Sequence, residues 1–160
     1  MHEVEALIAE TDHLAAAARK FETATVCSLA QGFSLLPITD ALAKELRGYQ
    51  PETKDIPTKP LGYLSDGLHA LAVAISHDTR VAYISTSYFG GQGGQDAIVW
   101  DKGSIRFSPI TPGYSQGWPN SSISQALRMI GVVAEGGQDE FDSLGLGKHR
   151  ETRRWAESTK

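Results

Sequence analysis

The sequence has few of the features that identify common classes of protein. Cys27 is the only cysteine, which excludes an internal disulfide and any cysteine-rich zinc site. The longest wholly apolar run, Ala70–Ile75, is far shorter than the roughly 20 residues that cross a bilayer. The first residues, Met1–Glu5, are acidic, whereas a secretory signal begins basic and then turns apolar. We therefore expect a cytoplasmic protein that does not enter a membrane.

Positive charge is also scarce, and it is unevenly placed. The net charge is −4 and the pI about 5.7, which argues against nucleic acid binding through the overall field. Residues 148–160 hold five cations and two carboxylates, so this tail carries +3 and the remaining 147 residues carry −7. We expect residues 149–160 to form a peripheral basic helix that docks on the acidic body. The acidic body suits a basic protein partner.

Length and hydrophobic patterning predict a single α+β domain over residues 1–160. The chain is 160 residues long, with 41% hydrophobic and 21% charged residues, which is typical of one globular core. We expect a mostly antiparallel sheet of about five strands with three to five helices. The expected strands are residues 23–29, 33–36, 80–87, 97–100 and 104–107, and the expected helices are 3–20, 40–47, 66–76, 122–130 and a last one from about 150.

The glycine-rich run over residues 88–95 is predicted to be a connection between strands. A phosphate-binding loop needs a helix behind its glycines, but the segment that follows has the pattern of a strand. A flexible or bulged connection and an adaptable contact loop both remain possible readings. For the contact loop, the candidate residues are Tyr88, Phe89, Gln92 and Gln95.

A second candidate loop covers residues 108–119. Its Gly113–Gly117 string matches the GxSxG nucleophile elbow, but prolines on both sides exclude the strand and helix that the elbow requires. This loop adds Tyr114, Gln116 and Trp118 to the candidate contact residues. The alternative for Phe89, Tyr114 and Trp118 is that they cover the end of the sheet.

The titratable side chains form no convincing catalytic or metal-binding pattern. The five histidines lack the spacing of a metal pair, and Cys27 in a strand is expected to fill the core. The carboxylates of residues 139–142 are expected on a solvated turn. We predict no catalytic residues, no metal and no cofactor. A small enzyme or ligand-binding domain that combines the 88–95 loop with His77 and Asp78 is the alternative, and a nucleic acid accessory protein acting through the basic tail is a third.

Three stretches resemble a known class of protein: Gln31–Asp40, Tyr88–Trp100 and Glu140–Arg150. Together they resemble small bacterial immunity proteins that are encoded beside secreted antibacterial toxins of polymorphic or type VI systems. The resemblance implies a cytosolic antidote that binds one cognate protein toxin and blocks its active site without catalysis of its own. This class has no shared catalytic residues to carry over. The oligomeric state stays open.

Overall fold

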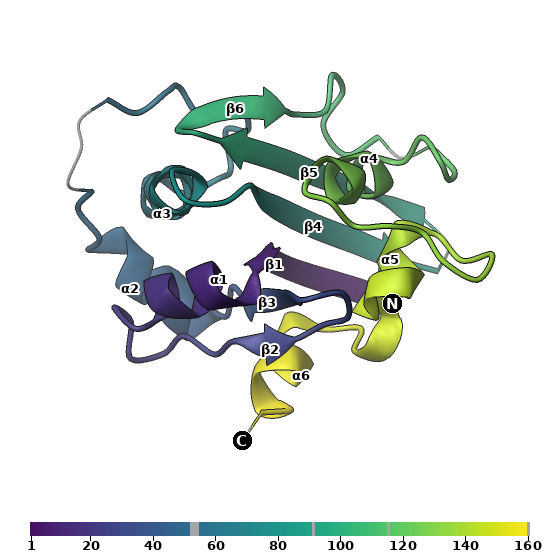
Figure 1. Ribbon diagram of the computed structural model, residues 1–160, viewed down its shortest axis with the longest axis horizontal. Coiled ribbons are helices and arrows are strands. Elements are labelled where there is room, and N and C mark those ends of the chain that lie inside the picture. The colour runs from purple at the N-terminus through teal and green to yellow at the C-terminus, as the bar shows by residue number, and fades with distance from the viewer. Residues whose placement is uncertain (52–54, 91, 115, 160) are drawn as a thin grey trace.

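A single six-stranded antiparallel sheet organises the protein in the computed structural model, which describes residues 1–51, 55–90, 92–114 and 116–159 (Figure 1). The strand order is β2-β3-β1-β4-β5-β6, so β1 lies in the interior of the sheet. The predicted α+β fold is confirmed, with one strand more than expected. The strands are β1 (His2–Glu10), β2 (Cys27–Ser28), β3 (Phe33–Pro37), β4 (Val81–Phe89), β5 (Gln92–Asp101) and β6 (Ser104–Phe107).

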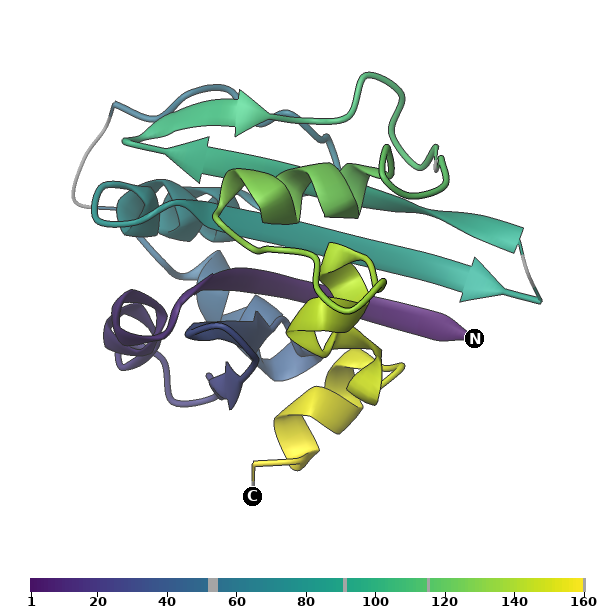
Figure 2. The ribbon, with the colours of Figure 1, turned by 45° about the vertical axis from the view of Figure 1, so that its right-hand side comes forward.

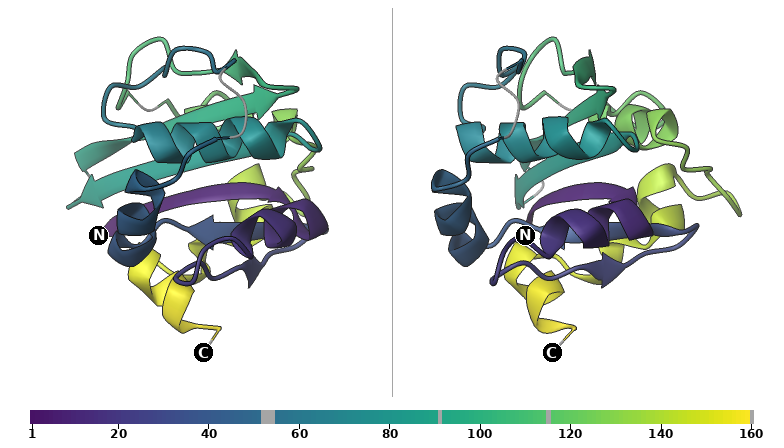
Figure 3. Two further views of the ribbon diagram at one scale, coloured as in Figure 1. Left: turned by 90° about the vertical axis from the view of Figure 1, so that its left-hand side faces the viewer. Right: turned by 60° about the vertical axis from the view of Figure 1, so that its left-hand side comes forward.

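Helices cover both faces of this sheet. Figure 3 shows α1, α2 and α3 over one face, and Figure 2 shows α4, α5 and α6 over the other. Six α-helices lie in the described ranges, where three to five were expected. They are α1 (Thr11–Ala18), α2 (Asp40–Arg47), α3 (Asp66–Ser76), α4 (Ser122–Met129), α5 (Glu140–Leu144) and α6 (Thr152–Glu157), with a 3-10 turn η1 (Leu146–Lys148) before the last.

The two helical layers enclose two separate hydrophobic clusters. Alternate residues of a strand point to opposite faces, so neighbouring residues of β1 supply both clusters. Leu7 belongs to the cluster under α1, α2 and α3, together with Tyr83 and Trp100. Ile8 belongs to the cluster under α4, α5 and α6, together with Ile84 and Val99.

The prediction of a helix over residues 3–20 is wrong for its first half. The chain runs as strand β1 to Glu10, and the helix begins only at Thr11. The cause is burial on both faces, since Ala6 to Ala9 are all fully buried. A strand that is covered on both sides has no alternation of apolar and polar residues, and a short apolar run of this kind does not distinguish strand from helix.

The glycine-rich run is also more regular than expected. Residues 92–95 belong to β5, and β4 and β5 form one long hairpin. Gly93 has a φ of +136°, and a Cβ atom on Gly94 would lie only 1.7 Å from the carbonyl oxygen of Gly113. Gly94 therefore allows the backbone of Gly113 to pack directly on the hairpin backbone.

Local signals predicted the helix starts well. The side chains of Thr39, Ser65 and Ser121 each accept a hydrogen bond from the backbone N–H three residues later, as N-caps do. The strand predicted over residues 23–29 is shorter, because only Cys27 and Ser28 pair with β3.

Asp139 is an N-cap as well, because its side chain accepts from the backbone N–H of Asp142 at the start of α5. The solvated turn predicted over residues 139–142 is therefore partly wrong. Glu140 lies in this short helix and is buried beneath Trp118 and Arg128.

The basic C-terminal segment is integrated into the fold. Its contact with the body is made by Trp155, which is buried, and not by Arg153 or Arg154, which pair with Glu151 and Glu157 of the same segment. The backbone also joins the sheet, because Glu3 N–H donates to the Arg150 carbonyl at 2.7 Å. The segment thus takes the place beside β1 that β3 leaves free.

Candidate functional site

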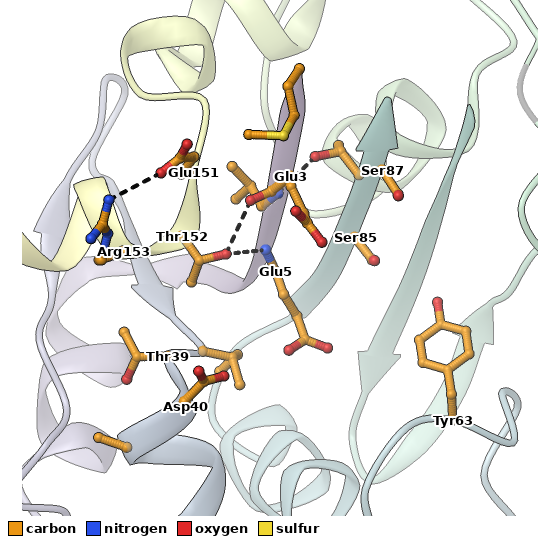
Figure 4. Close-up of a pocket in the computed structure, with 15 residues that line it drawn as sticks. Glu3, Glu5, Thr39, Asp40, Tyr63, Ser85, Ser87, Glu151, Thr152 and Arg153 are labelled. Carbon is orange, nitrogen blue, oxygen red and sulfur yellow. Dashed lines mark hydrogen bonds and ion pairs between the residues drawn. The ribbon is translucent and has the colours of Figure 1, made fainter. Parts of the chain in front are cut away.

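A polar groove lies on the part of the sheet that α1, α2 and α3 do not cover. On this face, Leu7 and Tyr83 pack into the hydrophobic cluster, but the residues further along the same strands are small or charged polar residues. Glu5 is paired with Ser85, and Glu3 with Ser87, so four polar side chains share one face. A cavity of about 790 Å³ opens above them (Figure 4).

The walls of the groove come from distant parts of the chain. Thr39 and Asp40 at the start of α2 form one side, and Tyr63 forms the other. The C-terminal segment closes a third side with residues 151–153. The side chains that line the groove include four carboxylates and one guanidinium, which are Glu3, Glu5, Asp40, Glu151 and Arg153. Met1, which carries the N-terminal amine, lines the groove as well, so the carboxylates still outnumber the cations. The groove therefore has a negative potential that attracts cations.

Glu5 is the best-positioned acid of the groove. Its Oε2 atom accepts a hydrogen bond of 2.5 Å from the hydroxyl of Tyr83, a side chain that is fully buried. Burial raises the pKa of Glu5, Asp40 raises it further, and the bond from Tyr83 opposes the rise. Figure 4 shows the carboxylate between Asp40 and Tyr63. Glu5 is thus held rigidly in a place where an added cation would stabilise its charge.

The Tyr63 wall is fixed by a buried carboxylate. The Tyr63 hydroxyl donates to Asp96 Oδ2 at 2.6 Å, and the Gly113 N–H donates to the other oxygen at 2.6 Å. Burial and the adjacent Asp96 raise the pKa of Tyr63 well above its ordinary value. Asp96 therefore holds one groove wall and the 108–119 loop in place together.

The predicted contact residues of the hairpin divide into two groups. Phe89 is 77% exposed, and Gln92 beside it at the hairpin tip is also exposed. By strand alternation Phe89 lies on the same face as Ser85 and Ser87, but beyond the residues that line the groove.

Tyr88 and Gln95 instead hold the hairpin against α4. Gln95 donates to the Tyr88 hydroxyl at 3.0 Å and accepts from the Ile123 N–H at 2.8 Å. These two residues therefore stabilise the hairpin, and only the exposed parts of their side chains can contact a ligand.

The predicted residues of the second loop also differ from one another. Tyr114 is 58% exposed, Trp118 is 54% exposed and Gln116 is exposed as well. Trp118 differs in that its Nε1 donates to Glu140 Oε2 at 2.8 Å. The Glu140 side chain is only 1% exposed and also binds Arg128 at 2.7 Å. Trp118 thus covers a buried ion pair, although it is about as exposed to solvent as Tyr114.

A smaller pocket of about 340 Å³ lies on the opposite face of the sheet. Tyr88 and Gln95 line it together with His2, Thr86 and Phe141. His2 Nδ1 bonds to the Thr86 hydroxyl at 2.7 Å, but its Nε2 is buried and has no partner among the described residues. Burial, Arg150 and the N-terminal amine lower the pKa of His2, so the ring is neutral near pH 7.

The structure does not bring His77 and Asp78 to the glycine run. His77 follows α3 and packs beside Gly103 in the β5–β6 turn, whereas the run lies at the opposite end of β5. With about 3.3 Å per strand residue, the two ends of β5 are roughly 30 Å apart. Cys27 is buried in the core as predicted, and burial raises the pKa of its thiol.

Within the described residues, the groove is accompanied by neither a metal-binding cluster nor a membrane-spanning helix. Within the described ranges, no group of three or more histidine, cysteine, aspartate or glutamate side chains is placed to hold a metal ion. No helix in these ranges is long and apolar enough to cross a bilayer. Comparison with protein-family models, with curated proteins and with solved structures found no similar protein.

Sequence reasoning missed the groove residues Glu5, Asp40 and Tyr63. The predicted first helix placed Glu3 and Glu5 on different sides, whereas a strand places them on the same side. One signal in the sequence could have revealed the site. Along the odd-numbered positions 81, 83, 85 and 87, which share one face of a strand, the residues change from Val and Tyr to Ser and Ser.

Proposed function

We propose that this chain is a non-enzymatic inhibitor, an immunity-type antidote that binds a basic protein toxin and blocks its active site. The observation that carries the proposal is the acidic groove on the open half of the sheet. Its central carboxylate, Glu5, is held in place by a buried tyrosine, and it forms no ion pair with a cation among the described residues. A surface that is already ordered loses little entropy when it binds.

The surroundings of the groove support a protein partner. The groove is about 790 Å³ in volume, which is enough for several side chains of an inserted loop. The exposed ring of Phe89 lies on the same face of β4, two residues beyond Ser87 of the groove, and aromatic side chains are frequent anchors of interfaces. The acidic lining would also accelerate association with a basic partner and exclude an acidic one.

The test is co-expression with the product of the neighbouring gene. We expect that product to be toxic alone, and this chain to relieve the toxicity through a complex that co-purifies. The charge-reversal variant Glu3→Lys/Asp40→Lys should lose both protection and co-purification, because both residues are exposed in the groove. A harmless neighbour, or toxicity that persists without a complex, would overturn the proposal.

A small-ligand-binding domain is the second candidate, and the His2 pocket favours it. The buried, unpartnered Nε2 of His2 is a costly feature that a ligand could satisfy. Tyr88 and Gln95 of the glycine-rich run line this pocket, although His77 and Asp78 do not. Mass spectrometry of small molecules released from the purified protein tests this candidate. A molecule retained by the wild type and lost from a His2→Phe variant would favour it over the inhibitor.

A further inference from the structure

The open face of the sheet presents several hydrogen-bond acceptors that a positively charged side chain of a partner can meet. Strands β1 and β4 present Glu5 and Ser85 side by side, and Asp40 faces them from the start of α2. Within the described residues, the only side-chain hydrogen bond to Glu5 comes from Tyr83 and uses Oε2. The Oε1 atom therefore remains as an acceptor toward the groove.

We propose that this groove binds an arginine-bearing loop of a basic protein, with the guanidinium seated between Glu5 and Asp40. This assignment rests on the proposed function for the identity of the partner as a toxin. The groove chemistry itself requires only an accessible arginine. Glu5 is the anchor of the interaction, and Asp40 and the Ser85 hydroxyl are additional acceptors.

Arginine fits these acceptors better than lysine does. Its guanidinium has five N–H donors in a planar fork, so one group can bond to several acceptors at the same time. It is also less strongly hydrated than an ammonium group, which lowers the cost of entering a half-buried site. Among the described residues that line the groove, the basic side chain is Arg153, which is already paired with Glu151 and Glu157.

The first experiment titrates the ¹⁵N-labelled full chain with an acetylated and amidated (Gly-Arg)₃ peptide at low salt. We expect amide shifts confined to residues 3–5, 39–41 and 85–87. The matching (Gly-Lys)₃ peptide should bind several-fold more weakly, and (Gly-Glu)₃ should not bind. Shifts scattered over the surface, or equal affinity for the lysine peptide, would overturn the assignment.

The same substitution, glutamate to glutamine, at two different positions then tests the role of Glu5 as the anchor. Glu5→Gln keeps an acceptor for Tyr83 but removes the charge, and we expect about tenfold weaker peptide binding. Glu135→Gln removes an exposed carboxylate outside the groove lining and should stay within about twofold of the wild type. Similar affinity for the two variants would refute a specific role for Glu5.

The pH dependence gives a readout that a purely structural role would not change. Glu5 faces Tyr83 on β4, Asp40 on α2, Glu3 on its own strand, Tyr63 on the opposite wall, and Glu151 and Arg153 of the C-terminal segment. Because a cation binds the ionised form, affinity should fall as the pH drops through the raised pKa of Glu5. The Glu5→Gln variant should lose that part of the pH profile.

The outcomes separate this assignment from the proposed function. If the arginine peptide binds in the groove but the neighbouring gene product is harmless, the proposed antidote function is refuted and the arginine assignment stands. If this chain neutralises the toxin and the toxin still binds the Glu5→Gln variant with full affinity, the proposed antidote function stands and the arginine assignment is refuted.

Discussion

Replacing Arg128 with methionine should strongly destabilise the fold, because Arg128 neutralises the buried Glu140. Its Nη1 atom lies 2.7 Å from Glu140 Oε1, and its Nη2 donates to the Pro119 carbonyl at 2.6 Å. Removing one partner of a buried ion pair costs about 3–5 kcal/mol. The Arg128 side chain is 39% exposed, so water can replace part of its role and the lower end applies. About 3 kcal/mol corresponds to a fall in Tm of roughly 6–12 °C for this chain length.

Thermal and urea unfolding of three variants measure this effect. Arg128→Met alone should show the full loss, and Arg128→Met/Glu140→Gln should recover part of it, because the neutral amide needs no cation and still accepts from Trp118. Arg19→Met, which removes an exposed arginine, should change stability by less than about 0.5 kcal/mol. A loss below about 1 kcal/mol for Arg128→Met, or no recovery in the double variant, would refute the reasoning.

The same ion pair predicts how stability depends on pH. Burial opposes the ionisation of Glu140, but the bonds from Arg128 and Trp118 outweigh it and lower its pKa. The folded state therefore releases this proton more readily than the unfolded state. The stabilisation is complete above the ordinary pKa of 4.5 and is lost as the pH falls through the lowered one. In Arg128→Met this acid-dependent loss should be much smaller.

Three further predictions concern other parts of the fold. Gly94→Ala should cost about 1–3 kcal/mol in urea unfolding, because its Cβ would collide with the Gly113 carbonyl, whereas Gly62→Ala, with open space around it, should be neutral. Glu5→Gln should raise the Tm at neutral pH, because the raised pKa of Glu5 means that its ionised form destabilises the fold and glutamine is neutral. The gain should vanish below pH 4.5, where Glu5 is protonated in both the folded and the unfolded state. A lower Tm of the variant at pH 7 would contradict this prediction. Trp155→Ala should cost about 3–5 kcal/mol by calorimetry, and a loss under 1 kcal/mol would show that the C-terminal helix is not part of the core.

The predictions from sequence succeeded where structure is decided locally. Thr39, Ser65 and Ser121 cap helices through bonds that span three residues, and such signals are visible in a short window. The Asp101–Gly103 turn between β5 and β6 is equally local, with Lys102 and Gly103 both at positive φ.

The predictions failed where distant partners decide the outcome. Glu140 resembles a solvated acid in the sequence, but its partners Arg128 and Trp118 are 12 and 22 residues away. The strand β1 resembles a helix because sheet neighbours and helices from the whole chain bury both of its faces. The groove was missed for the same reason, since its acids share a face only when residues 2–10 are extended.

The pairing of the C-terminal segment with β1 has a consequence for the order of folding. The Glu5 N–H bonds to the Thr152 hydroxyl across 147 residues of sequence, and the Glu3 N–H bonds to Arg150. Contacts this distant in sequence form slowly, because a very long loop must close before they are made. The pairing of residues 150–152 with β1 therefore forms late in folding, after β1 has paired with β3 and β4. The groove is completed at that late step, so a chain cut by proteolysis after residue 149 would keep most of its sheet but have one wall of the groove missing.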